Sequence, residues 1–220
     1  MTDSETKYAI RMILISTSLG GMSYLSFNNG LLLAYFSYLG IPSATILILL
    51  ALLPLSQFVF MIPFSYLSDI YGKKLIENFG MVLSIIGFFL MMIAGIFPNY
   101  FRTGVVGLGA GIFGTGSALI IGNWFALLHP IIPENVRGRF FGRLRLTWQS
   151  IGIAFTLVVI YILEQYPTLG MYQAVMAIIT ILMALRMIFY QRIPELEKII
   201  PKKESFRKSF IKVLAMPDYL

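Results

Sequence analysis

The sequence lacks cysteine entirely, contains one histidine and carries few charged residues. Without cysteine there is no disulfide, thiolate nucleophile or Cys-ligated metal, and a lone His does not make a metal site. We therefore expect no metal and no cofactor. Charged side chains make up 12% of the 220 residues, whereas a soluble domain carries about 25%. This shortage excludes an ordinary soluble enzyme, a disordered chain and a DNA-binding domain.

Apolar residues, in contrast, make up 58% of the sequence and include 18 Phe and 12 Met. A soluble domain of this length could not bury so many of them. From Met12 to Ser68 there are 57 residues without Asp, Glu, Lys or Arg, and a spanning helix needs about 20. This run predicts two spans, joined by a turn at 39–43 that contains Gly40 and Pro42.

Four more apolar runs follow, so the sequence predicts an all-α integral membrane protein. None of the runs alternates in polarity like a barrel strand. The predicted transmembrane helices lie at about 12–37, 43–67, 75–97, 103–128, 146–164 and 170–190, with the longest loop at 129–145. The chain then divides into a cytoplasmic N-terminus (1–11), a six-helix bundle (12–190) and a cytoplasmic linker (191–220). Apolar and basic residues at helical spacing over 206–214 predict an amphipathic surface helix in the linker or, alternatively, a solvated helix.

The distribution of basic residues predicts the orientation. With six spans, 16 of the 17 Lys and Arg residues fall on the side that holds both termini, and only Arg102 falls on the other. Cytoplasmic loops are enriched in Lys and Arg, so both termini are predicted to be cytoplasmic. Contact with anionic lipid accounts for the net charge of +7, and no nucleic-acid partner is expected. We expect a multi-pass protein of the cell membrane (plasma or inner).

The fourth predicted span is rich in glycine, with seven glycines from Gly104 to Gly122. Gly107 and Gly111 have the small-xxx-small spacing that lets helix backbones approach closely in lipid. We therefore predict a crowded central helix rather than direct contact of these glycines with a solute.

The loop after the second span carries a short motif of one acidic residue, one glycine and two lysines. The pattern resembles the signature of the major facilitator superfamily of transporters, Gly-x-x-x-Asp-(Arg/Lys)-x-Gly-(Arg/Lys)-(Arg/Lys). Ser65 stands at the first glycine of that signature and Ile70 at its first basic position. The four matching positions are Asp69, Gly72, Lys73 and Lys74. The loop, its side of the membrane and the order of the residues all agree with the family.

The resemblance implies half of a twelve-helix transporter fold, in which each six-helix half is built from 3+3 inverted repeats. A second six-helix half would come from the same gene or from another chain. The resemblance also implies that the motif forms a cytoplasmic gate with a Pro-x-x-x-Arg-Gly segment at 133–138, which holds Glu134 and Arg137. The Arg-x-x-x-Gly pattern that members carry in span four is not reproduced, because Arg102 precedes Gly107 by five residues.

The predicted binding groups are neutral, because no Asp, Glu, Lys or Arg is expected near the middle of a span. In the family, spans one and four line the central cavity, with two and five beside them. The substrate-binding candidates are Tyr24, Asn28, Asn29, Gln57, Ser117, Asn123, Trp148 and Gln149, with Asn28 first among them. On span one, a single helical face is expected to hold Thr17, Gly21, Tyr24, Asn28 and Tyr35. For each candidate an interhelical hydrogen bond is the alternative role.

The predicted function is secondary active or facilitative transport of a small polar organic solute by alternating access, without enzymatic activity. A non-transporting six-span scaffold or assembly protein is the main alternative. An intramembrane serine protease would need Gly-x-Ser-Gly and a His on another span. Here Ser117 is followed by Ala118, and His129 follows the same span. A channel would need a selectivity-filter sequence or a ring of charge, and the sequence has neither.

Overall fold

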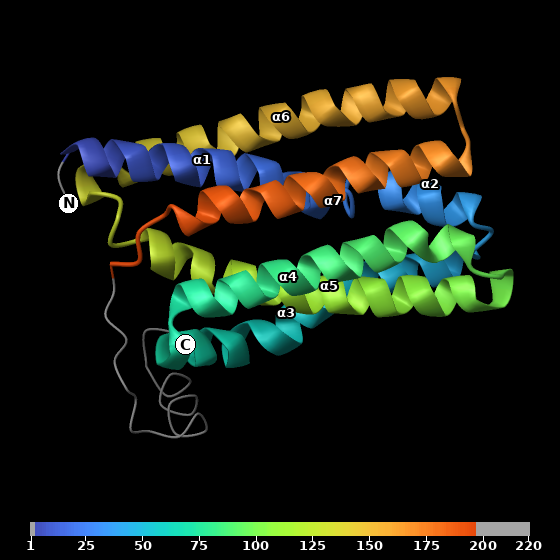
Figure 1. Ribbon diagram of the computed structural model, residues 1–220, viewed down its shortest axis with the longest axis horizontal. Coiled ribbons are helices and arrows are strands. Elements are labelled where there is room, and N and C mark those ends of the chain that lie inside the picture. The colour runs from blue at the N-terminus through green and yellow to red at the C-terminus, as the bar shows by residue number, and fades with distance from the viewer. Residues whose placement is uncertain (1–2, 197–220) are drawn as a thin grey trace.

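The computed structural model describes residues 3–196, and every regular element in this part of the chain is a helix (Figure 1). The α-helices are α1 Asp3–Leu25, α2 Leu31–Tyr38, α3 Ser43–Tyr71, α4 Lys73–Ile93, α5 Asn99–Leu128, α6 Arg137–Gln165 and α7 Leu169–Gln191, and the 3-10 helices are η1 Ala94–Ile96 and η2 Glu134–Val136. The amphipathic helix predicted over 206–214 lies outside the described residues. The all-helical prediction is confirmed.

Five helices are long and apolar enough to cross a membrane, namely α3, α4 with η1, α5, α6 with η2, and α7. They correspond to the second to sixth predicted spans. α3 continues through Pro54 and Pro63, as helices do in membranes where neighbouring helices satisfy the freed backbone groups.

The prediction of one continuous helix over 12–37 was wrong. α1 and α2 occupy this stretch and are separated by a short non-helical segment. There Asn29 Oδ1 accepts a hydrogen bond from the Leu31 N–H (3.1 Å), and Asn29 Nδ2 donates to Thr156 Oγ1 of α6 (3.0 Å). Gly30 has a φ of 88°, in the left-handed region that glycine adopts without steric cost. Because asparagine side chains compete with the helix for backbone hydrogen bonds, Asn29 and Gly30 favour a break between α1 and α2.

Two further helix boundaries differ from the prediction. α1 already begins at Asp3, inside the predicted N-terminal tail, and α6 begins at Arg137, inside the predicted loop at 129–145. Arginine is a good helix former, so a basic segment can continue a spanning helix beyond the apolar region. Charge in the sequence marks where the membrane ends rather than where the helix ends.

The long helices form two layers (Figure 1). α1 packs against α6 and α7 in one layer, α5 packs against α3 and α4 in the other, and α4 joins the layers through α7. α5 is crowded, as its glycines predict. The glycines that make the close contacts, however, are not the Gly107 and Gly111 pair. A Cβ on Gly116 would lie 2.5 Å from the carbonyl oxygen of Gly80 on α4, whereas one on Gly111 would have no atom within 4 Å.

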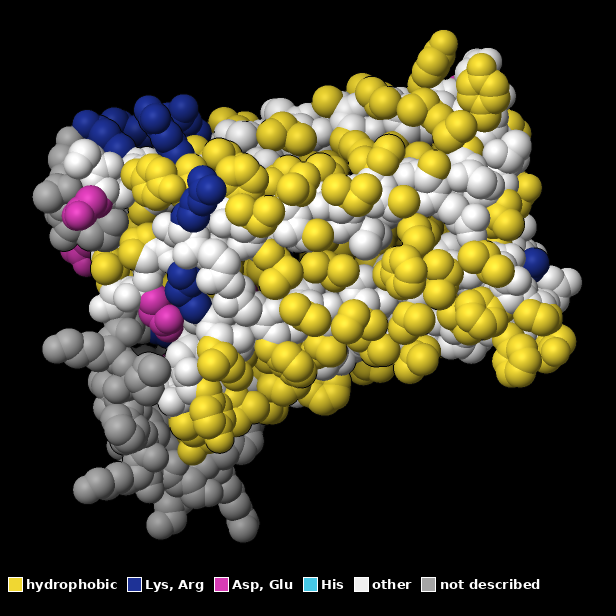
Figure 2. Space-filling model, viewed as in Figure 1, with side chains coloured by type: hydrophobic (Ala, Val, Ile, Leu, Met, Phe, Trp, Pro, Cys, Tyr) yellow, Lys and Arg dark blue, Asp and Glu magenta, His cyan; other side chains and the backbone are white. Residues whose placement is uncertain are grey.

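The surface divides by chemistry along the bundle (Figure 2). Apolar side chains cover the flanks, and Lys and Arg side chains gather at one end. We call this the basic end; α1, α4 and α6 begin there and α3, α5 and α7 end there. Large apolar side chains are exposed on the flanks, as with Phe58, which is 83% exposed. This is the surface of a bundle whose flanks face lipid rather than water.

Candidate functional site

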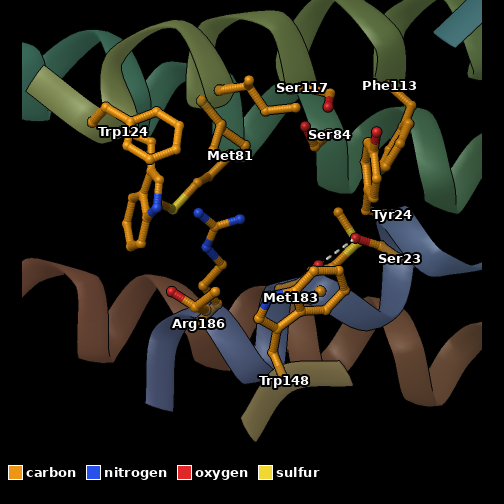
Figure 3. A pocket seen from close by; sticks show the side chains of 16 residues that line it. Ser23, Tyr24, Met81, Ser84, Phe113, Ser117, Trp124, Trp148, Met183 and Arg186 are labelled. Atoms are coloured by element: carbon orange, nitrogen blue, oxygen red, sulfur yellow. Dashed lines mark hydrogen bonds between the residues drawn. The ribbon is translucent and has the colours of Figure 1, made fainter. Parts of the chain in front are cut away.

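A cavity of about 330 Å³ lies between the two layers (Figure 3). It is lined by Thr17, Gly20, Gly21, Ser23 and Tyr24 of α1, Met81 and Ser84 of α4, Phe113, Ser117, Ile120, Ile121, Trp124 and Phe125 of α5, Trp148 of α6, and Met183 and Arg186 of α7. Cavities of about 300–1,000 Å³ with apolar walls and a few polar groups are typical small-molecule sites.

Aromatic rings form much of the cavity wall. Phe113 is held by a stacked contact with Phe27, with ring centroids 4.9 Å apart. Trp148 lies against the backbone of α1 at Gly21, where a Cβ would be 3.3 Å from the indole ring. Trp124 and Tyr24 face the same space (Figure 3). Rings fixed in this way give an apolar body of a solute a flat surface at low entropic cost.

One charged side chain, Arg186, projects from α7 into the cavity (Figure 3). The substrate-binding residues predicted from the sequence are all neutral, and this charged residue of the cavity wall is not among them. Arg186 Nη2 lies 3.5 Å from Glu77 Oε1 of α4, and the two side chains are 13% and 0% exposed. Tyr190 Oη donates to Glu77 Oε2 at 2.8 Å. Both charged residues fall within the predicted spans 75–97 and 170–190, so opposite charges inside two spans were the signal that could have identified the pair.

The Arg186 side chain packs against the backbone of α1 at Gly20. A Cβ at Gly20 would collide with Arg186 Cδ and would lie 2.6 Å from Nη1 and 2.8 Å from Nε. The α1 backbone therefore lets the Arg186 side chain lie directly across it. Arg186 consequently touches α1 and α4 from α7 and contacts helices of both layers.

Two hydroxyl groups in the cavity wall are buried without a hydrogen-bond partner in the described structure, Thr17 Oγ1 and Ser84 Oγ, and so is Arg186 Nε. Several other hydroxyls in the bundle bond back to a carbonyl of their own helix, as Thr115 does to Gly111 and Thr180 to Met176, whereas Ser16 Oγ, outside the cavity wall, is also buried without a partner in the described structure. A buried polar group without a partner costs stability, and all three atoms belong to side chains of the cavity wall.

Three of the predicted substrate-binding residues line the cavity, namely Tyr24, Ser117 and Trp148. Gln57 lies beside it and donates from Nε2 to Ser117 Oγ at 3.2 Å. Gln149 is exposed and is not among the lining residues, because one residue turns a helical side chain by about 100° from Trp148.

The asparagine candidates make structural contacts instead. Asn28 is exposed in the segment between α1 and α2 and donates to the Tyr24 carbonyl at 3.3 Å. Asn29 bonds to Thr156 and Leu31, as described above. Asn123 is 1% exposed, donates to the Leu119 carbonyl at 2.8 Å and contacts Ser68 Oγ.

The predicted single face of span one ends where α1 ends. Thr17, Gly21 and Tyr24 line the cavity. Tyr35 lies on α2 instead, is 0% exposed and donates to the Met92 carbonyl at 2.8 Å. The break between the helices changes the direction in which the later side chains project.

The motif residues lie at the basic end, where α3 meets α4. Asp69 is in the last turn of α3 and is half-buried. Gly72 separates the two helices with a φ of 100°, a conformation that strains any other residue. The backbone N–H groups of Lys73 and Lys74 donate to Glu195 Oε1 at 2.7 Å and 3.4 Å. The segment after α7 thus supplies a hydrogen-bond acceptor for backbone N–H groups in the first turn of α4.

The second predicted gate segment forms a compact turn at the start of α6. Arg137 Nη2 lies 4.0 Å from Glu134 Oε1. The same guanidinium donates to the carbonyls of His129 and Ile132, at 3.4 Å each. Arg137 therefore ties the end of α5 to the beginning of α6.

Together, the fold and this site define a multi-pass, all-helical membrane protein with a solute-sized cavity between its helices. Residues 13–218 match the model of the Major Facilitator Superfamily. The chain belongs to this superfamily of membrane transporters, which confirms the resemblance carried by the motif at 65–74. A search of curated proteins found no match.

Proposed function

We propose that the protein moves a small organic solute across the cell membrane by alternating access, either coupled to an ion or passively. The observation that carries this proposal is the aromatic-walled cavity with the Arg186 guanidinium in its wall, in a chain of a transporter superfamily. A scaffold or assembly protein would have no need of a solute-sized cavity with a charged group in its wall.

The proposed architecture is a six-span bundle of two inverted repeats, with α1 and α2 together as the first span. The first repeat would comprise α1 with α2, α3 and α4, and the second α5, α6 and α7. Exchanging the repeats maps the α3–α5 contact onto α6–α1 and the α4–α5 contact onto α7–α1. It also maps α3–α4 onto α6–α7 and leaves α4–α7 unchanged. This agreement among the main helix contacts supports a 3+3 repeat.

We further propose that a second six-helix half, from the same gene or another chain, packs beside this bundle. Alternating access requires two bodies that rock about a central site. Residues of the motif at the basic end, Asp69, Gly72, Lys73 and Lys74 with Glu134 and Arg137, would then form the cytoplasmic gate. The concentration of Lys and Arg at the basic end supports a cytoplasmic location for that end.

The orientation is tested with reporter fusions at two sites. A fusion after Arg192 is expected to report the cytoplasm, and an insertion at Asn99 the opposite side. The same location for both reporters would overturn the proposed arrangement of spans.

The gate is tested with Asp69→Asn, which removes charge and keeps shape. A carboxylate in the last turn of a helix can interact with a neighbouring charge or with the N-terminus of another helix. Such an interaction stabilises the conformation that contains it by about 1–2 kcal/mol, which changes a conformational equilibrium by about 5- to 30-fold. We expect Asp69→Asn to change the side from which a cysteine at Ile121, in the cavity wall, is labelled by a membrane-impermeant maleimide. The absence of natural cysteine makes this measurement direct. Glu164→Gln, an exposed carboxylate of α6, is the control, and equal behaviour of the two variants would remove Asp69 from the gate.

A further inference from the structure

We propose that the cavity takes a small organic anion, with a carboxylate or sulfonate head and an apolar body, and that Arg186 binds its head. This inference rests on the proposed function and specifies the chemical class of the solute. It follows from the chemistry of the wall, which combines one guanidinium with aromatic rings and hydroxyl groups.

The unpartnered atoms of the cavity wall share one property, because each can donate a hydrogen bond. Thr17 approaches from α1, Ser84 from α4 and Arg186 from α7, and their Oγ1, Oγ and Nε atoms are buried without partners in the described residues. Of the three residues Arg186 is the charged one, and a ligand with several acceptor oxygens fits its guanidinium. A guanidinium binds such oxygens with charge-assisted hydrogen bonds that are roughly twice as strong as neutral ones.

The remaining residues of the cavity wall fit the body of such an anion. Trp124, Trp148, Phe113 and Tyr24 offer ring faces, and Met81 and Met183 offer flexible apolar contacts. A cation would meet Arg186 without a free carboxylate nearby, since Glu77 is fully buried behind it and engaged by Tyr190. A neutral solute would leave the guanidinium without a new anionic partner.

In this site Glu77 and the anionic solute would compete for one group, the guanidinium of Arg186. The Arg186–Glu77 contact is long, 3.5 Å between Nη2 and Oε1, so Arg186 is not saturated by its partner. Removing the charge of Glu77 should therefore strengthen anion binding. A purely structural ion pair predicts the reverse, since loss of Glu77 would then disorder Arg186 and weaken the site.

The experiment compares two probes of similar shape, benzenesulfonate and uncharged benzenesulfonamide, with the intact protein in lipid nanodiscs. We expect saturable binding of benzenesulfonate and at least about tenfold weaker binding of the sulfonamide, the value of one charge-assisted hydrogen bond. Arg186→Gln should remove this preference, and Glu77→Gln should tighten benzenesulfonate binding by about tenfold. Arg145→Gln removes a surface charge at the basic end and should change nothing.

A second variant covers the case in which Arg186→Gln fails to fold, since it leaves Glu77 buried without its counter-charge. Glu77→Gln with Arg186→Gln keeps the pair neutral and should fold while losing the preference for the anion. Equal binding of the two probes by the wild type, retention of the preference in the double variant, or weaker binding in Glu77→Gln would each overturn the anion site.

Uptake of the same probes into proteoliposomes separates this inference from the proposed function. Arg186-dependent binding of benzenesulfonate without any uptake would count against transport and leave the anion site standing. Uptake of the sulfonamide in preference to the sulfonate would support transport and overturn the anion site.

Discussion

Gly87 of α4 and Gly109 of α5 face each other so closely that neither has room for a side chain. A Cβ on Gly109 would lie 2.7 Å from the Gly87 carbonyl oxygen, and one on Gly87 would lie 2.6 Å from the Gly109 carbonyl oxygen. Gly80 and Gly116 repeat this reciprocal contact further along the same pair of helices. Small residues are enriched at helix interfaces in lipid because they let the backbones approach this closely.

We predict that Gly109→Ala destabilises the protein, whereas Gly111→Ala does not. The first substitution forces α4 and α5 apart, and such overpacking costs about 1–3 kcal/mol. The second places its methyl group in open space two residues further along α5. Thermal unfolding of the purified variants in detergent measures the difference, and equal melting temperatures would contradict the packing argument.

Glu195 fastens the segment after α7 to the start of α4 and forms the basis of a second prediction. Its Oε1 accepts from the Lys73 and Lys74 N–H groups, and Lys74 Nζ donates to the Gln191 carbonyl at 2.8 Å. Loss of a capping carboxylate costs about 1 kcal/mol. Glu195→Ala should therefore speed hydrogen exchange at the first turn of α4, and Glu195→Gln, which keeps an acceptor, should do so less. Glu164→Ala, at the far end of α6, serves as the control and should leave that turn unchanged.

Much of the fold could be predicted from the sequence because membrane helices are encoded locally. Apolar length and the positions of Lys and Arg suffice for α3, α4, α5 and α7 to within a few residues. The break after α1 could not be predicted in this way. It involves a hydrogen bond from Asn29 to Thr156, which lies 127 positions away on α6.

The candidate site was only partly predictable for the same reason. Tyr24, Ser117 and Trp148 were identified because polar and aromatic residues of spans one, four and five stand out in an apolar sequence. Arg186 was missed because, read alone, a basic residue near the end of a span resembles an ordinary cytoplasmic positive charge. The role of Arg186 depends on Glu77, which lies on another helix, and only the packing of α4 against α7 brings the two residues together.

Tyr190 supports this pair, and its hydroxyl gives a third prediction. Tyr190 Oη donates to Glu77 at 2.8 Å, and both residues are fully buried. Tyr190→Phe leaves the carboxylate with the longer Arg186 contact alone, which should lower the free energy of unfolding by about 1–3 kcal/mol. In a Glu77→Gln background the same substitution should cost less, because no buried charge then loses a donor. Tyr166→Phe, an exposed residue at the end of α6, is the control, and an equal loss in both backgrounds would show that Tyr190 acts by packing alone.

The last prediction is that anion binding takes up a proton. When a solute engages Arg186, Glu77 is left as a buried carboxylate with only Tyr190 as donor, and such a charge is costly enough that protonation relieves it. The groups that face Glu77 from α7 are Arg186 and Tyr190. On the other helices packed against α4, α3 offers Asp69 in its last turn, and the charged residue of α5, Arg102, lies at the opposite end.

The sign of the effect follows from linkage. If the complex holds more protons than the free protein, binding strengthens as pH falls. Benzenesulfonate stays charged throughout, so any pH dependence belongs to the protein. Titration calorimetry in buffers of different ionisation enthalpy should report uptake of up to about one proton per anion bound by the wild type. Glu77→Gln should bind with no proton uptake and no pH dependence near neutrality. If that variant takes up as many protons as the wild type, the proton goes to another group, and Glu77 does not compete with the solute for Arg186.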